Sequence, residues 1–195
     1  MTSTTRTTSA PLAATSSPSA TRPETVLVTS ARARGWLAAL RIATGWVFLW
    51  AFLDKAFGLG FSTPAAGAWI RGGSPTKGFL TGAGVTGPLK PFFADIAGPA
   101  TDILFMVGML AIGIAVILGV GLRISAVVGS VVMVLMYLAE WPFTINVAST
   151  NPLVDYHIVY ALALIVAACL ATGDTFGFGR FWKQLGLVRK NGWLV

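Results

Sequence analysis

The amino-acid sequence predicts an all-α membrane protein: a bundle of four transmembrane helices, with a long outer loop of short helices between the first and the second. The first observation is composition, because 55% of the 195 residues are hydrophobic and only 11% are charged. Soluble domains carry about 25% charged residues, so lipid is the expected solvent. The second observation is that four apolar segments are each long enough to cross a bilayer.

A bilayer core of about 30 Å requires roughly 20 helical residues. Segments that meet this requirement lie at about 36–56, 102–122, 123–141 and 153–172. They define an expected transmembrane domain over 34–175. Arg123 is the only charge between the second and third segments, which predicts a very short turn and a tight antiparallel hairpin. Ala111, Ala115 and Gly119 form a stripe of small residues, which predicts the face on which the second helix packs closely.

The first part of the chain, residues 1–33, has a different composition from the rest. Half of its first thirty residues are serine or threonine, and proline recurs among them. Such a segment buries too little apolar surface to offset the entropy of ordering it. We therefore predict a disordered cytoplasmic tail.

The outer loop, residues 57–99, is rich in glycine and proline but also contains large apolar side chains. Thr63-Pro64 and Ser74-Pro75 each have the pattern of an N-cap followed by proline at the first helical position. These signals predict a cap of short helices packed over the outer mouth of the bundle. Long loops in compact domains are more often functional than idle.

Lysine and arginine residues gather at one side of the expected bundle. With the N-terminus inside, the cytoplasmic side carries Arg6, Arg22, Arg32, Arg34, Arg41, Arg123, Arg180, Lys183, Arg189 and Lys190. The outer side carries Lys55, Arg71, Lys77 and Lys90. This bias predicts cytoplasmic N- and C-termini in a multi-pass protein of the plasma membrane. Residues 176–195 mix aromatic and basic side chains, as expected of an amphipathic tail on an anionic inner leaflet.

Three ionisable residues are expected at one depth, beneath the outer loop. Asp54 ends the first segment, Glu140 ends the third, and His157 lies about one turn into the fourth. Ionisable residues inside a membrane are expensive and often functional. Asp54 has two interpretations, an interfacial pair with Lys55 or an inward-facing group that pairs with the fourth helix.

His157 is the single histidine of the chain. A membrane histidine can relay protons or hydrogen-bond a quinone carbonyl, so Asp54 and His157 are the candidate catalytic residues for proton handling. The alternative is a structural histidine satisfied by Asp54 or by a backbone carbonyl. On a helix, His157 shares a face with Tyr160, whereas Asp155 points roughly the opposite way.

Further candidate binding residues are Tyr160 and Glu140 near His157, and the basic loop residues Arg71, Lys77 and Lys90. The basic residues would attract a small anion; a solvated loop is the alternative reading. Arg41 lies about two turns into the first segment. We expect it to snorkel to the inner headgroups, with pairing inside the bundle as the alternative.

Several classes of site have no signal in this sequence. One cysteine, Cys169, cannot form a disulfide framework, a dithiol pair or a thiolate metal site. Neither a metal site nor a nucleotide fingerprint is evident. The net charge of +7 does not indicate a nucleic-acid partner, because the basic residues sit beside the ends of apolar runs.

Three motifs carry a family resemblance. They are Arg41…Gly45-Trp-Val-Phe-Leu-Trp-Ala-Phe-Leu-Asp54-Lys55…Gly58, Gly72-Gly73-Ser74-Pro75-Thr76-Lys77-Gly78-Phe79, and Asn151-Pro152…Asp155-Tyr-His157-Ile-Val-Tyr160. Over residues 36–182 the sequence resembles the DoxX/DoxD family of small bacterial four-helix membrane proteins, and the long first outer loop resembles the DoxD branch.

The resemblance implies a function that the residues alone do not establish. DoxD proteins are described as membrane subunits of a thiosulfate:quinone oxidoreductase that act with a second subunit. The resemblance therefore implies quinone as a cofactor, a reduced sulfur anion as donor, and a bacterial plasma membrane. DoxX relatives are linked to redox-stress complexes, so a non-catalytic accessory or assembly subunit of a membrane complex is the alternative. A channel is disfavoured, because no polar stripe runs the full depth of the membrane.

Overall fold

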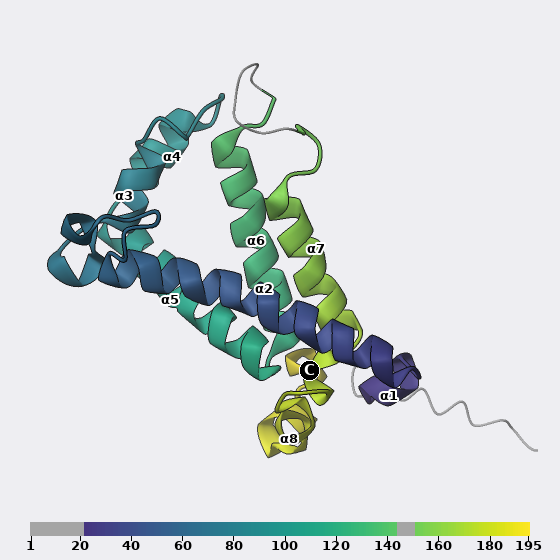
Figure 1. Ribbon diagram of the computed structural model, residues 1–195. Helices are drawn as coiled ribbons and strands as arrows, with labels where there is room; N and C mark the ends of the chain where they lie inside the picture. Colours follow the sequence, from purple (N-terminus) through teal and green to yellow (C-terminus); the bar gives the residue numbers. More distant parts are fainter. Residues whose placement is uncertain (1–21, 144–150) are drawn as a thin grey trace, which may run out of the picture.

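The computed structural model describes residues 22–143 and 151–195. Every regular element in these two ranges is a helix, so the all-α class is confirmed there (Figure 1). Most of the predicted N-terminal tail, residues 1–21, lies outside the described residues.

Three helices are long and apolar enough to cross a membrane: α2 (Ala31–Phe57), α5 (Pro99–Leu118) and α6 (Leu122–Glu140). Their lengths of 27, 20 and 19 residues agree with the expected membrane association. A fourth apolar helix, α7 (Tyr156–Cys169), has only 14 residues. At 1.5 Å per residue it is about 21 Å long, which is shorter than the predicted segment 153–172.

The helices associate in two pairs, α2 with α5 and α6 with α7. In Figure 1, α5 and α6 diverge from their shared turn in a V. The prediction that the second and third helices pack as a tight hairpin is therefore wrong, although the connection between them is short. The turn also lies earlier than expected, because Gly119 and Gly121 adopt left-handed φ values of 73° and 56°, and Arg123 falls inside α6.

Close backbone approach explains why α5 packs on α2. A Cβ at Gly113 would lie 2.7 Å from the backbone nitrogen of Leu49, and one at Gly45 would lie 2.9 Å from that of Ile117. Of the predicted small-residue stripe, Ala111 is exposed and Gly119 approaches Gly173 instead of α2. Glycine on both helices lets the two backbones meet without side chains between them.

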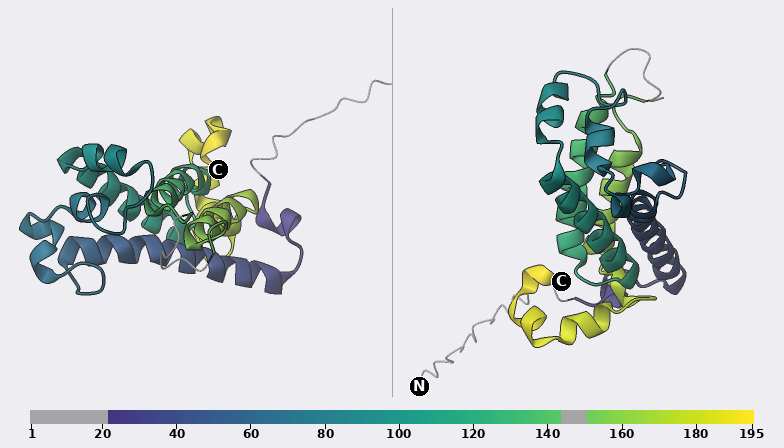
Figure 2. Two further views of the ribbon diagram at one scale, coloured as in Figure 1. Left: turned by 90° about the horizontal axis from the view of Figure 1, so that it is seen from above. Right: turned by 90° about the vertical axis from the view of Figure 1, so that its left-hand side faces the viewer.

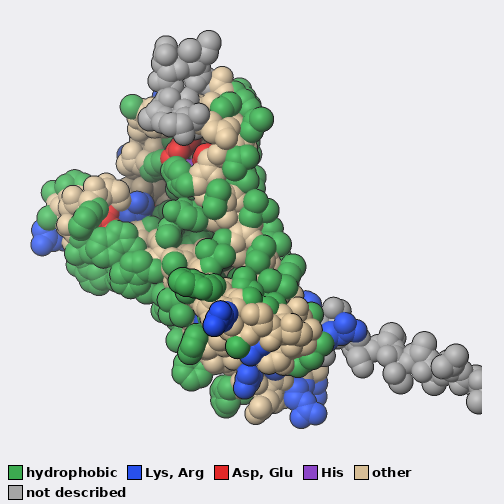
Figure 3. All heavy atoms as spheres, turned by 45° about the vertical axis from the view of Figure 1, so that its right-hand side comes forward, with side chains coloured by type: hydrophobic (Ala, Val, Ile, Leu, Met, Phe, Trp, Pro, Cys, Tyr) green, Lys and Arg blue, Asp and Glu red, His purple; other side chains and the backbone are tan. Residues whose placement is uncertain are grey.

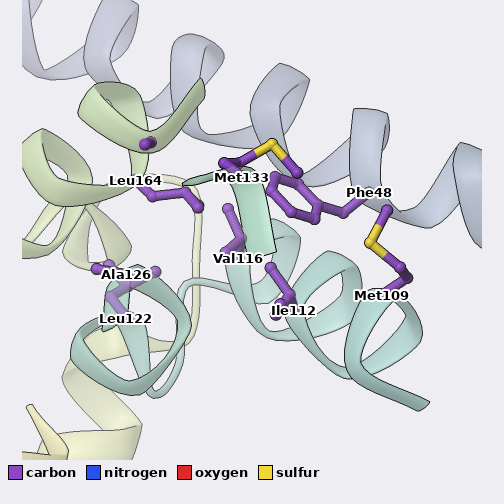
Figure 4. Close-up of a cluster of buried hydrophobic side chains, with 9 residues drawn as sticks. Phe48, Met109, Ile112, Val116, Leu122, Ala126, Met133 and Leu164 are labelled. Atoms are coloured by element: carbon purple, nitrogen blue, oxygen red, sulfur yellow. The ribbon is translucent and has the colours of Figure 1, made fainter. Parts of the chain in front are cut away.

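The central core fills the space where the two helix pairs meet. Its buried members come from all four long helices and are Phe48, Met109, Ile112, Val116, Leu122, Ala126, Met133, Ala161 and Leu164. Figure 4 shows these side chains converging from α2, α5, α6 and α7. The core thus ties α7 to the three longer helices.

Four short elements connect α2 to α5: η2 (Ala65–Gly67), η3 (Trp69–Arg71), α3 (Pro75–Leu80) and α4 (Lys90–Ile96). The Ser74 hydroxyl caps α3 by accepting from Lys77 N at 3.2 Å, as predicted. The stretch after Thr63-Pro64 forms two 3-10 turns instead of one short helix.

These connecting elements pack on the end of α6. Leu80, Val85 and Phe93 form a second core with Ala139, and Thr86 N donates to Ala139 O at 3.0 Å. Thr76 of α3 donates from its backbone N and its hydroxyl to the buried carboxylate of Asp102 in α5. The segment is therefore fastened to both α5 and α6.

The prediction of disorder for 22–33 is corrected by the N-terminal strap, residues 22–30, and by the first turn of α2. The strap contains α1 (Glu24–Leu27) and ends where α2 begins. Glu24 is fully buried; its backbone N donates to Asp174 Oδ2 at 3.0 Å, and its carboxylate accepts from the Thr175 hydroxyl at 2.5 Å. Specific polar contacts with a distant turn hold the strap, and composition alone does not reveal such contacts.

Arg41 does not snorkel to the surface as expected, since only 1% of its surface is exposed. Its Nη1 donates to Val116 O and Ile117 O, each at 2.5 Å. Its Nη2 donates to Thr175 O at 3.2 Å and Phe176 O at 2.9 Å. The guanidinium therefore caps the C-terminus of α5, where carbonyls lack helical partners and the helix dipole is negative.

The C-terminal part is a chain of short elements instead of one amphipathic helix. After η4 (Thr172–Asp174) come α8 (Gly179–Gln184), α9 (Gly186–Lys190) and η5 (Gly192–Leu194). Figure 2 shows α8, α9 and η5 beside the end of the bundle where α5 meets α6. Large apolar side chains remain exposed there.

Replacing Arg41 tests its capping role. Arg41→Met leaves four buried or partly buried carbonyls without their charged donor, and hydrogen bonds to charged groups contribute roughly 1.5–3 kcal/mol each. We expect a loss of thermal stability of roughly 10 °C in detergent, and only partial recovery with Arg41→Lys, which lacks the planar fork. Arg32→Met, an exposed position on the same helix, is the control. An unchanged midpoint for Arg41→Met would contradict the role.

Glu24 predicts a pH dependence of stability. Burial raises the pKa of its carboxyl above the ordinary 4.5, although the hydrogen bond from Thr175 opposes this rise. The folded chain then holds the proton more tightly than the unfolded chain. Its stabilising contribution is full below about pH 4.5 and is lost as pH rises through the folded-state pKa.

We expect Glu24→Gln, an uncharged mimic, to remove this loss when thermal midpoints are measured over a pH series. Asp95→Asn, at an exposed acid of α4, should keep the wild-type profile. The same pH profile in Glu24→Gln and wild type would rule the interpretation out.

Candidate functional site

The start of α7 is built around Asp155. This residue is the N-cap, and its Oδ1 accepts from His157 N at 3.0 Å and Ile158 N at 3.2 Å. The expected start near residue 153 is therefore wrong. Asn151 caps a preceding turn instead, since its Oδ1 accepts from Leu153 N at 2.9 Å. The chain enters α7 with its first free N–H groups satisfied by a carboxylate.

The same carboxylate also holds the ring of His157. Asp155 Oδ2 lies 2.7 Å from His157 Nδ1. The prediction that Asp155 points away from His157 is wrong, because it assumed helical geometry for both residues. As the N-cap, Asp155 has an extended backbone, with φ −100° and ψ −175°, and its side chain folds back over the first turn.

His157 is buried, with 1% of its surface exposed. Its second ring nitrogen, Nε2, is also buried and has no hydrogen-bond partner within the described parts of the chain. The Tyr156 ring lies beside the imidazole, with ring centroids 4.0 Å apart. A buried polar atom without a partner costs about 1–3 kcal/mol, so Nε2 is a candidate position for a ligand or water. Buried atoms of Glu24, Arg41 and Ser130 also lack partners in the described structure.

Glu140, at the end of α6, completes the cluster. The Tyr156 hydroxyl lies 3.2 Å from Glu140 Oε1 and 3.4 Å from Oε2. Donor atoms of Glu140, Asp155 and His157 all lie within 4.8 Å of one another. Figure 3 shows acidic side chains and the histidine together at one end of the molecule. We call Glu140, Asp155, Tyr156 and His157 the α6–α7 cluster.

Asp54 is not part of this cluster. It is buried, as the inward-facing interpretation expected, but its partners are local: it accepts from Phe61 N, Ser62 N and the Ser62 hydroxyl at 3.1, 3.0 and 2.6 Å. The expected pairing of Asp54 with the fourth helix is not observed. The carboxylate organises the turn that follows α2, which is a structural role.

The other predicted site residues divide into two groups. Tyr160 lies one turn beyond Tyr156, with ring centroids 6.0 Å apart, and borders the central core. Arg71, Lys77 and Lys90 are exposed on η3, α3 and α4. Within the described ranges no contact brings these three cations together. Their expected anion site therefore has no geometric support.

Sequence reasoning included Glu140 and His157 but missed the roles of Asp155 and Tyr156. A usable signal was present, because an aspartate followed by an apolar helix is a typical N-cap. An N-cap two residues before a histidine brings its carboxylate to the ring.

No protein-family model matches the chain, and comparisons with curated proteins and with solved structures find no significant match. The geometry of the α6–α7 cluster is therefore the basis for a functional assignment.

Proposed function

We propose that the chain spans the plasma membrane of a bacterium four times, through α2, α5, α6 and α7. The support for α7 as a span is that it packs against α6 and crosses α2. Its outward side chains Val159, Leu162 and Ile165 are 51%, 55% and 42% exposed, as expected of a lipid-facing surface. Because α7 itself is only about 21 Å long, the proposed span includes non-helical residues on either side of it.

Both termini are proposed to lie in the cytoplasm. Basic residues concentrate at the end where the strap and α8–α9 lie, seen in blue in Figure 3, which suits the positive-inside rule. The α6–α7 cluster and the connection from η2 to α4 then lie at the outer side, and the connection becomes an outer cap loop.

We further propose that the protein is a subunit of a quinone-linked oxidoreductase, as the resemblance to DoxX/DoxD proteins suggests. The observation that carries this is the buried imidazole of His157, whose Nε2 has no partner in the described structure. It lies near the end of apolar helices, where a quinone head group dissolved in lipid would reside. A quinone oxygen hydrogen-bonded to Nε2 would give this atom a partner, and the Tyr156 ring would lie against the head group.

The overall reaction, oxidation of thiosulfate by quinone, balances in atoms and electrons without a reaction at the thiol of Cys169. Two thiosulfate anions lose one electron each and join through a new sulfur–sulfur bond. The quinone takes both electrons and two protons from water to become quinol. Cys169 is the single cysteine, so a redox centre between donor and quinone would belong to a partner subunit.

The second candidate is a non-catalytic accessory subunit of a membrane complex. The observation that favours it is the exposure of apolar side chains in the C-terminal segment, where Phe176 is 77%, Leu187 is 70% and Trp193 is 63% exposed. Such a surface suits docking of another subunit or of the inner leaflet. Co-purification from native membranes distinguishes these occupants.

Membrane topology is testable with single cysteines in a Cys169→Ala background. We expect an impermeant maleimide to label Gly84→Cys in intact cells, and to label Leu187→Cys only after permeabilisation. Both positions are exposed. Labelling of both from outside would indicate an odd number of spans, and the reverse pattern would overturn the orientation.

The redox proposal is tested by thiosulfate-dependent quinone reduction in liposomes with the full chain and its co-purified partners. We expect His157→Phe to lower the rate at least about tenfold, equivalent to one lost hydrogen bond of ~1.4 kcal/mol. Asp95→Asn, far along the sequence and exposed, should leave the rate unchanged. Absence of thiosulfate-dependent reduction, or a wild-type rate in His157→Phe, would sink this proposal.

A further inference from the structure

The α6–α7 cluster has the composition of a metal-binding set. It offers two carboxylates, from Glu140 and Asp155, and one imidazole, with donor atoms within 4.8 Å of one another. Mixed oxygen and imidazole donors suit divalent cations such as Zn²⁺ and Mn²⁺. Metal–ligand bonds of about 2.0–2.2 Å bring such donors to about 3 Å apart, so Glu140 would have to move inward by 1–2 Å.

The contacts of Glu140 are compatible with that movement. Its carboxylate is half-buried and is held by the Tyr156 hydroxyl at 3.2 and 3.4 Å, which are long hydrogen bonds. The same hydroxyl can follow the carboxylate and keep it oriented. Hydrogen bonds of this kind from outside the ligand set orient metal ligands and raise affinity.

The negative charge of the two carboxylates in the cluster also favours a bound cation. In the described ranges, neither carboxylate forms an ion pair with a lysine or arginine, and the basic group beside them is His157 itself. The Asp155 side chain is only 9% exposed, so water screens it little. Partly buried carboxylates of this kind are usually paired or bound to a metal.

The two nitrogens of His157 would then have separate tasks. Nδ1 faces the carboxylate of Asp155 at 2.7 Å, so it is the nitrogen that can join the two carboxylates. Nε2 is buried and unpartnered across the described structure. A metal on Nδ1 leaves the ring neutral with its proton on Nε2.

We propose that Glu140, Asp155 and His157 bind one divalent cation of the Zn²⁺ class, through their carboxylates and Nδ1. Water fills the remaining coordination positions. The bound metal makes Nε2–H a permanent hydrogen-bond donor. The use of this donor rests on the proposed quinone function, because a quinone carbonyl would accept the hydrogen bond. Metal binding itself does not depend on that function. The sequence alone did not indicate such a site.

The test measures metal binding by purified full-length protein in detergent after chelator treatment and dialysis. Titration with Zn²⁺ by calorimetry is expected to show one saturable site per chain, and added Zn²⁺ is expected to raise the thermal midpoint. The Glu140→Gln, Asp155→Asn and His157→Gln variants should each bind Zn²⁺ at least tenfold more weakly. Asp155→Asn keeps a side-chain oxygen for the N-cap, so it guards against loss of fold.

Asp95→Asn is the matched control, an exposed acid outside the cluster that should bind Zn²⁺ as the wild type does. Circular dichroism and gel filtration confirm that each variant is folded. The proposal is overturned if no saturable site is found, or if folded Glu140→Gln and His157→Gln variants keep wild-type affinity.

Metal and quinone outcomes are separable. Zn²⁺ binding without thiosulfate-dependent quinone reduction supports the metal site and refutes the redox function. Quinone reduction at the wild-type rate in protein that binds no Zn²⁺ supports the redox function and refutes the metal site. Tighter quinone binding by the Zn²⁺-loaded protein than by the chelator-treated protein supports the link between them.

Discussion

The buried guanidinium of Arg41 is the interaction on which one end of the molecule depends. It places a positive charge where α5 ends and donates to carbonyls of both α5 and the turn at 175–176. Phe178 N supplies a further donor, to Leu118 O at 2.8 Å. Because these groups belong to segments distant in sequence, satisfying the end of one helix also fixes α2, α5 and the C-terminal segment relative to one another.

Glycine makes this arrangement geometrically accessible. A Cβ at Gly173 would lie 2.1 Å from the carbonyl oxygen of Gly119, so the α5–α6 turn and η4 meet backbone to backbone. The strap closes over the same region, where Asp174 accepts from both Glu24 N and Lys183 Nζ. At this end Glu24, Arg41 and Asp174 hold segments that are distant in sequence together.

The opposite end differs in how its polar groups are satisfied. Asp54 and Asp102 are buried, but N–H and hydroxyl groups of Ser62 and Thr76 satisfy them. In the α6–α7 cluster, by contrast, the carboxylates have no basic partner beyond His157, and one imidazole nitrogen is unpaired in the described structure. Glu24 Oε1 and Arg41 Nε at the other end also lack partners in the described structure. The unpaired nitrogen of His157 differs because it lies beside two carboxylates without a lysine or arginine partner, and this separates His157 from Asp54.

The sequence by itself determined what depends on local chemistry. Apolar composition and segment length indicated helices that associate with a membrane, and Ser74-Pro75 indicated the cap of α3. The collection of acids and the histidine near one end was also visible. Only the tertiary structure decided the pairing of α2 with α5, the burial of Arg41 and the partner of Asp54. It also brought Asp155 to His157 and Tyr156 to Glu140. Periodicity describes one helix at a time, whereas these contacts depend on backbone approach at Gly45 and Gly113 and on a non-helical N-cap.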